Sequence, residues 1–142
     1  MNSFEINPLK GVDTLEFGMS PAQVRGVLNV EFESFKRSPA AACPCDYFPN
    51  LGVFGYYTGE GKLEALEFAL PSQVLLDGRN LLSVGFDAAT SLLKAKDEKL
   101  EHYVDMVIAH AVGVSLYAPQ AEESPGSPCE SVLVFAEGYY NL

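Results

Sequence analysis

Basic residues are scarce in this chain. Only nine of its 142 residues are lysine or arginine, against 19 aspartates and glutamates, so the formal net charge is −10. Nucleic acids and anionic membranes are bound chiefly by basic side chains that neutralise their phosphates. The charge balance therefore argues against a protein that binds nucleic acid or a membrane. It is compatible with a basic protein partner, because opposite charge raises the rate of encounter, although solubility alone would also explain it.

Long apolar runs are also lacking. No stretch approaches the roughly 20 consecutive apolar residues that span a bilayer. The opening MNSFEINPLK has neither the basic start nor the apolar segment typical of a signal peptide. We therefore expect a cytoplasmic protein. The length is that of one ordinary domain and is too short for two independent cores, which predicts a single domain over residues 1–142.

Cysteine is sparse and odd in number, with Cys43, Cys45 and Cys129. Such a set does not resemble the disulfide framework of a small secreted protein. The segment CPCD, which holds the first two thiols, suggests a metal or redox cluster. A tetrahedral zinc site usually takes a second ligand pair, however, and His102, His110 and the third cysteine form no recognisable one. A surface loop ordered by proline is the alternative interpretation, and no cofactor or metal is expected.

Catalytic motifs are missing as well. The chain contains no G-x-S-x-G nucleophile elbow, no phosphate-binding or dinucleotide-binding glycine loop and no H-E-x-x-H helix. His102 and His110 would share a face on either a helix or a strand, so their spacing decides nothing. Glu64 and Glu67 would point to opposite faces of a strand, which does not suit the carboxylate pair of a glycosidase. We expect a protein without enzymatic activity.

The segment LEFGMSPAQVRGVL, residues 15–28, predicts a short strand followed by a helix. Ser20 is a typical N-cap, Pro21 suits the first helical position, and Gln23 completes a capping box. Apolar residues then continue at helical spacing. The expected helix has about three turns and depends on tertiary packing, because Gly26 weakens its interior.

The strand signals lie on either side of a proline-rich segment. VEFESFKR, residues 30–37, predicts a strand, whereas SPAAACPCDYFPN, residues 38–50, predicts a loop. LGVFGYY and KLEALEFAL, joined by TGEG within residues 51–70, predict an antiparallel hairpin.

A similar order recurs in the second half. VGFDAATSLLKAKD, residues 84–97, predicts a helix with Asp87 as its N-cap, and VGVSLYA and ESVLVF repeat the patterns of LGVFGYY and LEALEF. Helix, strand and strand thus occur twice at a separation of about 60–70 residues. The pattern predicts an α+β domain of two related halves, each a helix plus an antiparallel hairpin, at about residues 12–72 and 79–140. A single α+β meander is the alternative.

Three segments carry a resemblance to a known group. GVDTLEFGMSPAQVRGVLN, DYFPNLGVFGYYTGEGKLEALEF and ESVLVFAEGYYNL resemble small bacterial proteins of polymorphic-toxin gene neighbourhoods, some of which are immunity proteins. FGMSPAQVRGVLN is also similar to a sequence motif of outer-membrane assembly lipoproteins and of beta-lactamase inhibitory proteins. The latter proteins are tandem repeats of helices plus a sheet. The sequence as given shows neither the signal peptide nor the lipobox cysteine of these exported groups, so we do not expect a role in the cell envelope. The shared motifs are structural, so the resemblance transfers no catalytic residue.

Together these features predict a binding protein, most concretely an immunity protein that neutralises a cognate toxin by occlusion. Adjacent tyrosines at 56–57 and 139–140 would each send one ring to either face of a sheet, and exposed tyrosine beside acids suits a protein-binding surface. The candidate contacts are Tyr57, Glu60, Glu64, Glu67, Glu122 and Glu123.

Two other functions stay open at this stage. Exposed strand edges would suit a structural domain that self-associates, for example as a homodimer. A small metal protein that uses Cys43, Cys45 and the histidines is the less favoured reading.

Overall fold

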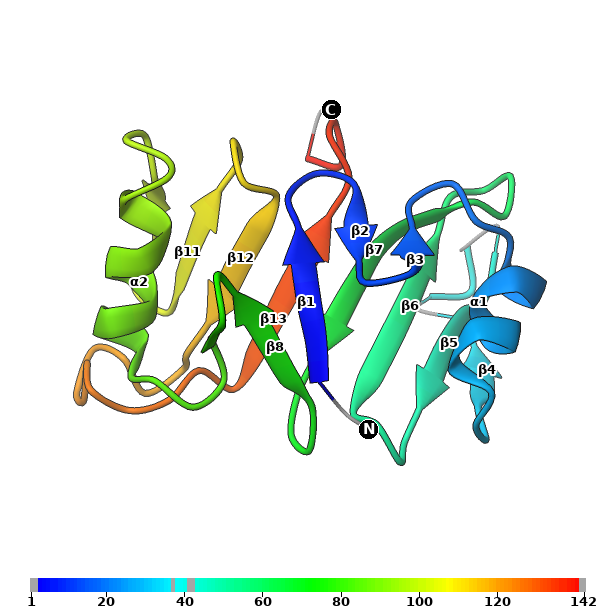
Figure 1. Cartoon of the computed structure of the whole chain (residues 1–142), viewed down its shortest axis with the longest axis horizontal. Coiled ribbons are helices and arrows are strands. Elements are labelled where there is room, and N and C mark those ends of the chain that lie inside the picture. The colour runs from blue at the N-terminus through cyan, green and yellow to red at the C-terminus, as the bar shows by residue number, and fades with distance from the viewer. Residues whose placement is uncertain (1–2, 37, 41–42, 141–142) are drawn as a thin grey trace.

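Two β-sheets pack face to face in the computed structural model of the chain, and one helix lies at each end (Figure 1). The structure describes residues 3–36, 38–40 and 43–140. The helices are α1 (Pro21–Leu28) and α2 (Phe86–Lys94). The predicted α+β class is confirmed in this form, as a mixed domain with two short helices and two sheets. The described part of the chain contains no helix of the length and apolarity needed to cross a membrane.

The larger sheet has eight strands and is antiparallel throughout, in the order β10-β11-β12-β13-β7-β6-β5-β4. Its strands are β4 (Glu33–Phe35), β5 (Cys45–Phe48), β6 (Val53–Tyr57), β7 (Leu63–Phe68), β10 (Glu101–His102), β11 (Met106–Ala109), β12 (Val114–Tyr117) and β13 (Ser131–Phe135). Each helix precedes four of these strands along the chain. The two sets of four meet at the centre of the sheet, where β7 pairs with β13.

The smaller sheet has five strands in the order β3-β2-β1-β8-β9. They are β1 (Ser3–Asn7), β2 (Gly11–Val12), β3 (Leu15–Glu16), β8 (Gln73–Leu76) and β9 (Arg79–Asn80). Its central pair, β1 and β8, is parallel. The main core lies between this sheet and the larger one, where the rings of Phe4 and Phe68 lie 5.2 Å apart.

Helix α1 begins as its sequence predicts. The Ser20 hydroxyl accepts a hydrogen bond from the backbone N–H of Gln23, and the Gln23 side chain accepts one from the N–H of Ser20, which completes the capping box. The expected length of about three turns was wrong, because the helix has eight residues, about two turns. It ends where Asn29 adopts a left-handed conformation with φ 49°.

Helix α2 is capped differently from the prediction. Its N-cap is Gly85, and Asp87 lies in the first turn, where its carboxylate accepts from the N–H of Ala88. The loop between β12 and β13 packs against this end and supplies carbonyls: Ser127 accepts from the N–H of Phe86 at 2.8 Å. The loop thus satisfies first-turn N–H groups that a capping side chain would otherwise bind.

The strand predictions had mixed outcomes. The hairpin within residues 51–70 is confirmed as β6 and β7, and the segments 112–118 and 130–135 contain the antiparallel pair β12 and β13. The strand expected over residues 30–37 is only the three residues of β4. The loop expected over residues 38–50 was wrong, because β5 lies within it. Residues 37, 41 and 42 of these segments lie outside the described residues.

Two glycines make the same kind of turn before β6 and before β12. Gly52 has φ 72° and Gly113 has φ 75°, and the N–H of each donates to the last carbonyl of the preceding strand. A Cβ at these positions would lie 2.3 Å from the Ala69 oxygen and 2.6 Å from the Phe135 oxygen. Only glycine fits such a turn without a backbone shift.

Candidate functional site

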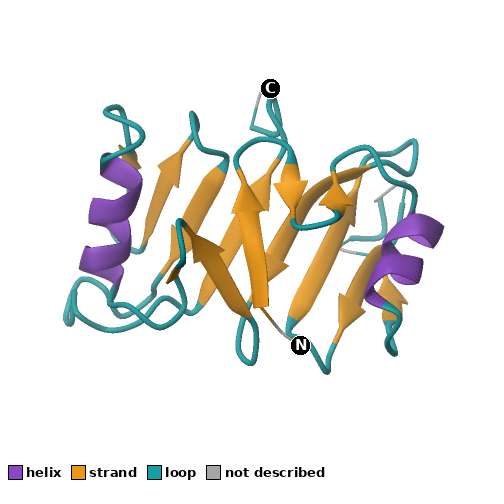
Figure 2. Cartoon of the chain, in the orientation of Figure 1, coloured by secondary structure: helices purple, strands orange, loops and turns teal. Residues whose placement is uncertain are grey.

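The two faces of the eight-stranded sheet are covered unequally. One face, here the inner face, packs against the five-stranded sheet and both helices in a single core. Figure 2 shows the helices at opposite ends of the large sheet, with the smaller sheet between them. The opposite face, here the outer face, carries no helix or strand in the described part of the chain. A bare sheet face is the natural candidate for an interaction surface.

Aromatic rings gather on one half of the outer face. Tyr47 stacks on Phe54 with ring centroids 4.3 Å apart, and Phe54 lies 6.4 Å from both Phe35 and Tyr56. These residues come from β4, β5 and β6 and share a face because their positions are paired or alternate across the strands. Phe35 is 41% exposed, so the row of rings reaches solvent at the sheet edge.

A second aromatic group covers the middle of the outer face. The chain turns back after β13, and the ring of Tyr140 lies 5.0 Å from Phe135 and 5.7 Å from His110. Tyr139 lies 5.0 Å from Tyr140 and 5.7 Å from Phe135. Phe135 is only 2% exposed although no helix or strand of the described residues covers it. The tyrosines therefore act as its cover and present their own rings outward.

The charged side chains that the described strands place on this face are acidic. Among the described residues, none of the eight strands contains a lysine or an arginine. Glu33, Glu67 and Glu101 lie at outer-face positions, opposite Tyr47, Phe54 and Ile108. The Tyr103 hydroxyl and His110 both bond to Glu101 and hold the pKa of that carboxyl below its usual value. The surface is therefore aromatic and acidic.

A hollow of about 310 Å³ opens in this surface. Its lining includes four tyrosine rings, Tyr56, Tyr117, Tyr139 and Tyr140, together with the carboxylate of Glu67. The Tyr56 hydroxyl donates a hydrogen bond to Glu67 across the neighbouring strands β6 and β7. The hollow therefore combines aromatic side chains with one acceptor of fixed position.

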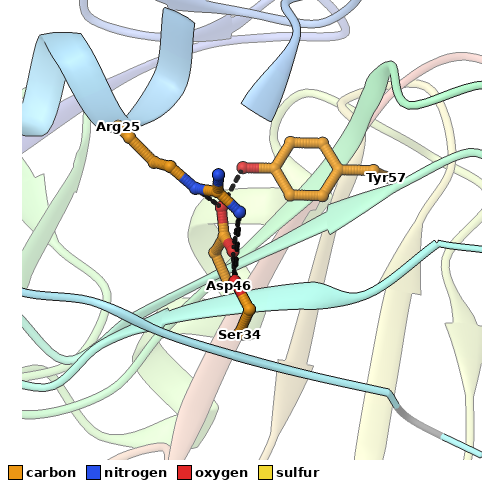
Figure 3. A network of polar contacts seen from close by, with 4 residues as sticks. All are labelled: Arg25, Ser34, Asp46 and Tyr57. Atoms are coloured by element: carbon orange, nitrogen blue, oxygen red, sulfur yellow. Dashed lines mark hydrogen bonds and ion pairs between the residues drawn. The ribbon is translucent and has the colours of Figure 1, made fainter. Parts of the chain in front are cut away.

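The inner face carries a polar network beside α1 (Figure 3). The carboxylate of Asp46, which is fully buried, accepts hydrogen bonds from Arg25, from Ser34 at 2.7 Å and from the Tyr57 hydroxyl at 2.9 Å. Burial raises the pKa of Asp46 most strongly, but the three donors together outweigh it and hold that pKa below its usual value. Burial and the bond to Asp46 raise the pKa of Tyr57. The network joins α1 to β4, β5 and β6 and is structural.

This network corrects one predicted contact. Tyr57 is 7% exposed and points to the inner face, so it is not available to a partner. The other ring of the pair, Tyr56, lies on the outer face. Tyr139 and Tyr140, expected to diverge, both pack against Phe135 on the outer face because they lie beyond the end of β13.

The five predicted glutamates do not form one patch. Glu67 lies on the outer face, in the lining of the hollow. Glu60 is exposed in the turn between β6 and β7, and Glu64 is half-buried in β7. Glu122 and Glu123 are exposed in the loop between β12 and β13, which folds against α2 at the other end of the molecule (Figure 1).

The cysteines and histidines are dispersed. Cys45 lies on the outer face opposite Phe35, and Cys129 is buried elsewhere. His102 pairs with an inner-face position of β11, whereas His110 bonds to Glu101 on the outer side. Within residues 3–36, 38–40 and 43–140 no three potential metal ligands lie close together.

The outer-face rings Phe35, Tyr47, Phe54 and Phe135 were missed as a group. For Tyr47, Phe54 and Phe135 a signal is present in CDYF, VFGYY and SVLVF, which place apolar or aromatic residues at successive positions and so on both faces of a strand. Such a strand is typical of a sheet with two apolar faces. No family model, curated protein or solved structure matched the chain.

Proposed function

We propose that this protein is a non-catalytic binding domain whose outer face docks onto a basic protein. Its role would be that of a cytoplasmic immunity protein that neutralises a bacterial toxin by covering a functional surface. The observation that carries the proposal is the outer face itself, which is aromatic and acidic and carries no helix or strand in the described part of the chain. Binding surfaces are enriched in tyrosine and phenylalanine and depleted in lysine, and opposite charge favours a basic partner.

The size of the outer face suits such a contact. Eight strands at roughly 4.8 Å spacing make a face about 34 Å wide, and the strands, which have two to six residues, are about 14 Å long on average. The projected area is then about 480 Å², and the accessible area of projecting side chains is larger. A standard interface buries about 800 Å² on each partner. The face can therefore supply a large part of one interface.

Occlusion also suits the rigidity of this surface. Its rings project from paired strands and pack against one another, so little side-chain freedom is lost on binding. Blocking an enzyme requires affinity and coverage and no chemistry from the inhibitor. The outer face offers both.

The proposal includes two related halves, at about residues 12–72 and 79–140. Each contains a helix followed by four antiparallel strands, and Gly52 and Gly113 make matching turns before the third strand of each set. The pairing of β7 with β13 would then be the seam between the halves. The outer face would be formed by both.

Co-expression with the products of neighbouring genes tests the proposed function. We expect one of them to form a stable complex and to lose its activity in it. Replacing three exposed outer-face aromatics, Phe35, Tyr103 and Tyr140, by serine should weaken the complex by about 100-fold or more, because exposed aromatics are common hot spots.

The matched control replaces exposed apolar residues away from the outer face. Val27 on α1 and Leu70 beyond β7 are 43% and 78% exposed, and changing both to serine should leave the complex intact. Failure to find any partner among the neighbouring products would count against the proposed function. Equal weakening by both sets of substitutions would count against the outer face.

A further inference from the structure

We propose that the hollow on the outer face is a cation-recognition pocket that receives one arginine or lysine side chain of the protein partner, an inference that rests on the proposed function. The lining of the pocket includes Tyr56, Tyr117, Tyr139, Tyr140 and Glu67, together with Met106, Ser115, Ser131 and Leu133. Ring faces attract cations through their quadrupole, and a carboxylate in the same hollow fixes where the positive charge lies.

The walls come from three separate parts of the fold. Tyr56 lies on β6, Tyr117 on β12, and Tyr139 and Tyr140 follow β13. Rings are therefore supplied from more than one side of the hollow. A volume of about 310 Å³ is at the small end of the range for ligand pockets, which suits one side chain better than a large organic ligand.

The position and bonding of the Glu67 carboxylate suit the binding of a cation. Glu67 accepts a hydrogen bond from Tyr56, which holds one of its oxygens in place. It forms no ion pair with any described residue. A carboxylate has about four acceptor positions, so this single bond leaves room for a guanidinium or an ammonium group. Glu67 is also half-buried, and an ion pair formed there is screened less by salt than a fully exposed one.

The surroundings favour positive ligands over neutral or negative ones. No lysine or arginine is among the described residues that line the hollow. The whole chain carries a net charge of −10. The negative electrostatic potential of such a protein attracts cations and repels phosphates and carboxylates.

The position of the pocket favours a partner's side chain over a free cation. Glu67 pairs with Leu133 where β7 meets β13, at the middle of the eight-stranded sheet. Interface hot spots cluster near the centre and are ringed by contacts that exclude water. Here the rings of Phe54 and Tyr47 extend the apolar surface on one side, so a docked protein would seal the pocket.

The test is an NMR titration of the full chain with three small probes. Nα-acetyl-arginine amide and Nα-acetyl-lysine amide carry the expected cations, and Nα-acetyl-citrulline amide is the neutral counterpart of the first. We expect the two cations to shift the backbone amide signals of Glu67, Ser115 and Leu133, and citrulline to leave them unchanged. Equal shifts with citrulline would overturn the proposal.

Two variants assign the effect to the pocket. Glu67→Gln keeps the shape and removes the charge, and should weaken binding of the cations by about 10-fold. Glu5→Gln, a half-buried strand glutamate of the other sheet, is the matched control and should bind normally. Tyr140→Ser, at a site 36% exposed, is the second pocket variant and should also bind more weakly. Unchanged affinity in both pocket variants would overturn the proposal.

The same variants separate this proposal from the proposed function. If a neighbouring gene product binds wild type and Glu67→Gln equally well, the cation pocket is wrong while the docking face stands. If the probes bind but no protein partner exists, the cation site stands and the proposed function is wrong. A homodimer that the arginine probe dissociates would make a second copy the occupant and would overturn the assignment to a different partner.

Discussion

Arg25 on α1 and Asp46 on β5 form a two-point ion pair in which both nitrogen–oxygen distances are 2.8 Å. The pair links residues that are far apart in the chain and holds the short α1 helix against the inner face. The guanidinium also lies 4.4 Å from the ring centre of Phe32. Asp46 is fully buried, whereas the Arg25 side chain is 34% exposed, so the carboxylate is the more sensitive member of the pair.

Asp46→Asn should destabilise the fold by about 2 to 3 kcal/mol. The substitution removes the charge and replaces one carboxylate oxygen by an amide nitrogen, so the donors that converge on this side chain, including the buried Tyr57 hydroxyl, lose an acceptor. This costs more than the loss of an exposed pair. Urea unfolding followed by circular dichroism measures the change. The control is Asp77→Asn, which breaks the exposed pair with Lys96 and should cost less than about 0.5 kcal/mol. Equal losses in the two variants would refute the structural role of Asp46.

The same carboxylate predicts a dependence on pH. Because the pKa of Asp46 is lowered in the folded state, the unfolded chain binds this proton more readily. The stability that Asp46 contributes is therefore complete above its ordinary pKa of 3.8 and is lost as the pH falls below that value. The difference in free energy of unfolding between wild type and Asp46→Asn should be constant from about pH 7 to pH 5 and shrink below about pH 4.

Other groups do not disturb this comparison. The pKa of Glu101 is lowered too, by bonds from Tyr103 and His110, but that carboxylate is present in both proteins and its effect cancels in the difference. A difference that stays constant to about pH 3 would contradict the pKa direction of Asp46.

Gly113→Ala should destabilise the protein by about 2 kcal/mol or more, because an L-residue is strained at φ 75° and its Cβ would meet the Phe135 oxygen at 2.6 Å. Gly52→Ala should behave in the same way, with a contact of 2.3 Å to the Ala69 oxygen. Thermal and urea unfolding measure both changes.

Gly26→Ala is the matched control and should change stability in the opposite direction. Gly26 lies inside α1, and an added Cβ would meet nothing within 4 Å. Alanine is favoured over glycine in a helix by about 1 kcal/mol. A gain at Gly26 together with losses at Gly52 and Gly113 would show that the two turns require glycine, whereas losses at all three would point to a general intolerance of alanine.

The sequence predicts a structural element correctly where a few neighbouring residues determine its conformation. The Ser20 and Gln23 side chains bond to each other's backbone, so the start of α1 follows from four residues. The strand β5 was missed because prolines stand on both sides of it, and its pairing with β4 and β6 is what makes it a strand. Pro44 and Pro49 lie just outside β5, so their missing N–H groups remove no hydrogen bond from its pairing with the neighbouring strands.

The candidate site was less predictable, for a reason of topology. Alternation shows that Tyr56 and Tyr57 point to opposite faces, but it does not say which face the second sheet will cover. That choice depends on the parallel pairing of β1 with β8, where Phe4 lies opposite Val74. No local sequence pattern predicts that β1 and β8, which are far apart in the chain, pair with each other.

The three thiols should differ sharply in reactivity. Cys129 is 5% exposed and burial raises its pKa to about 11, so about one molecule in a thousand carries the reactive thiolate at pH 8. Cys45 is 2% exposed, whereas Cys43 is half-buried. Reaction with a disulfide reagent should therefore show one fast thiol in the native protein and three in urea, and Cys43→Ser should remove the fast phase. Two fast thiols together with zinc or iron in the purified protein would instead favour a metal-binding role for Cys43 and Cys45.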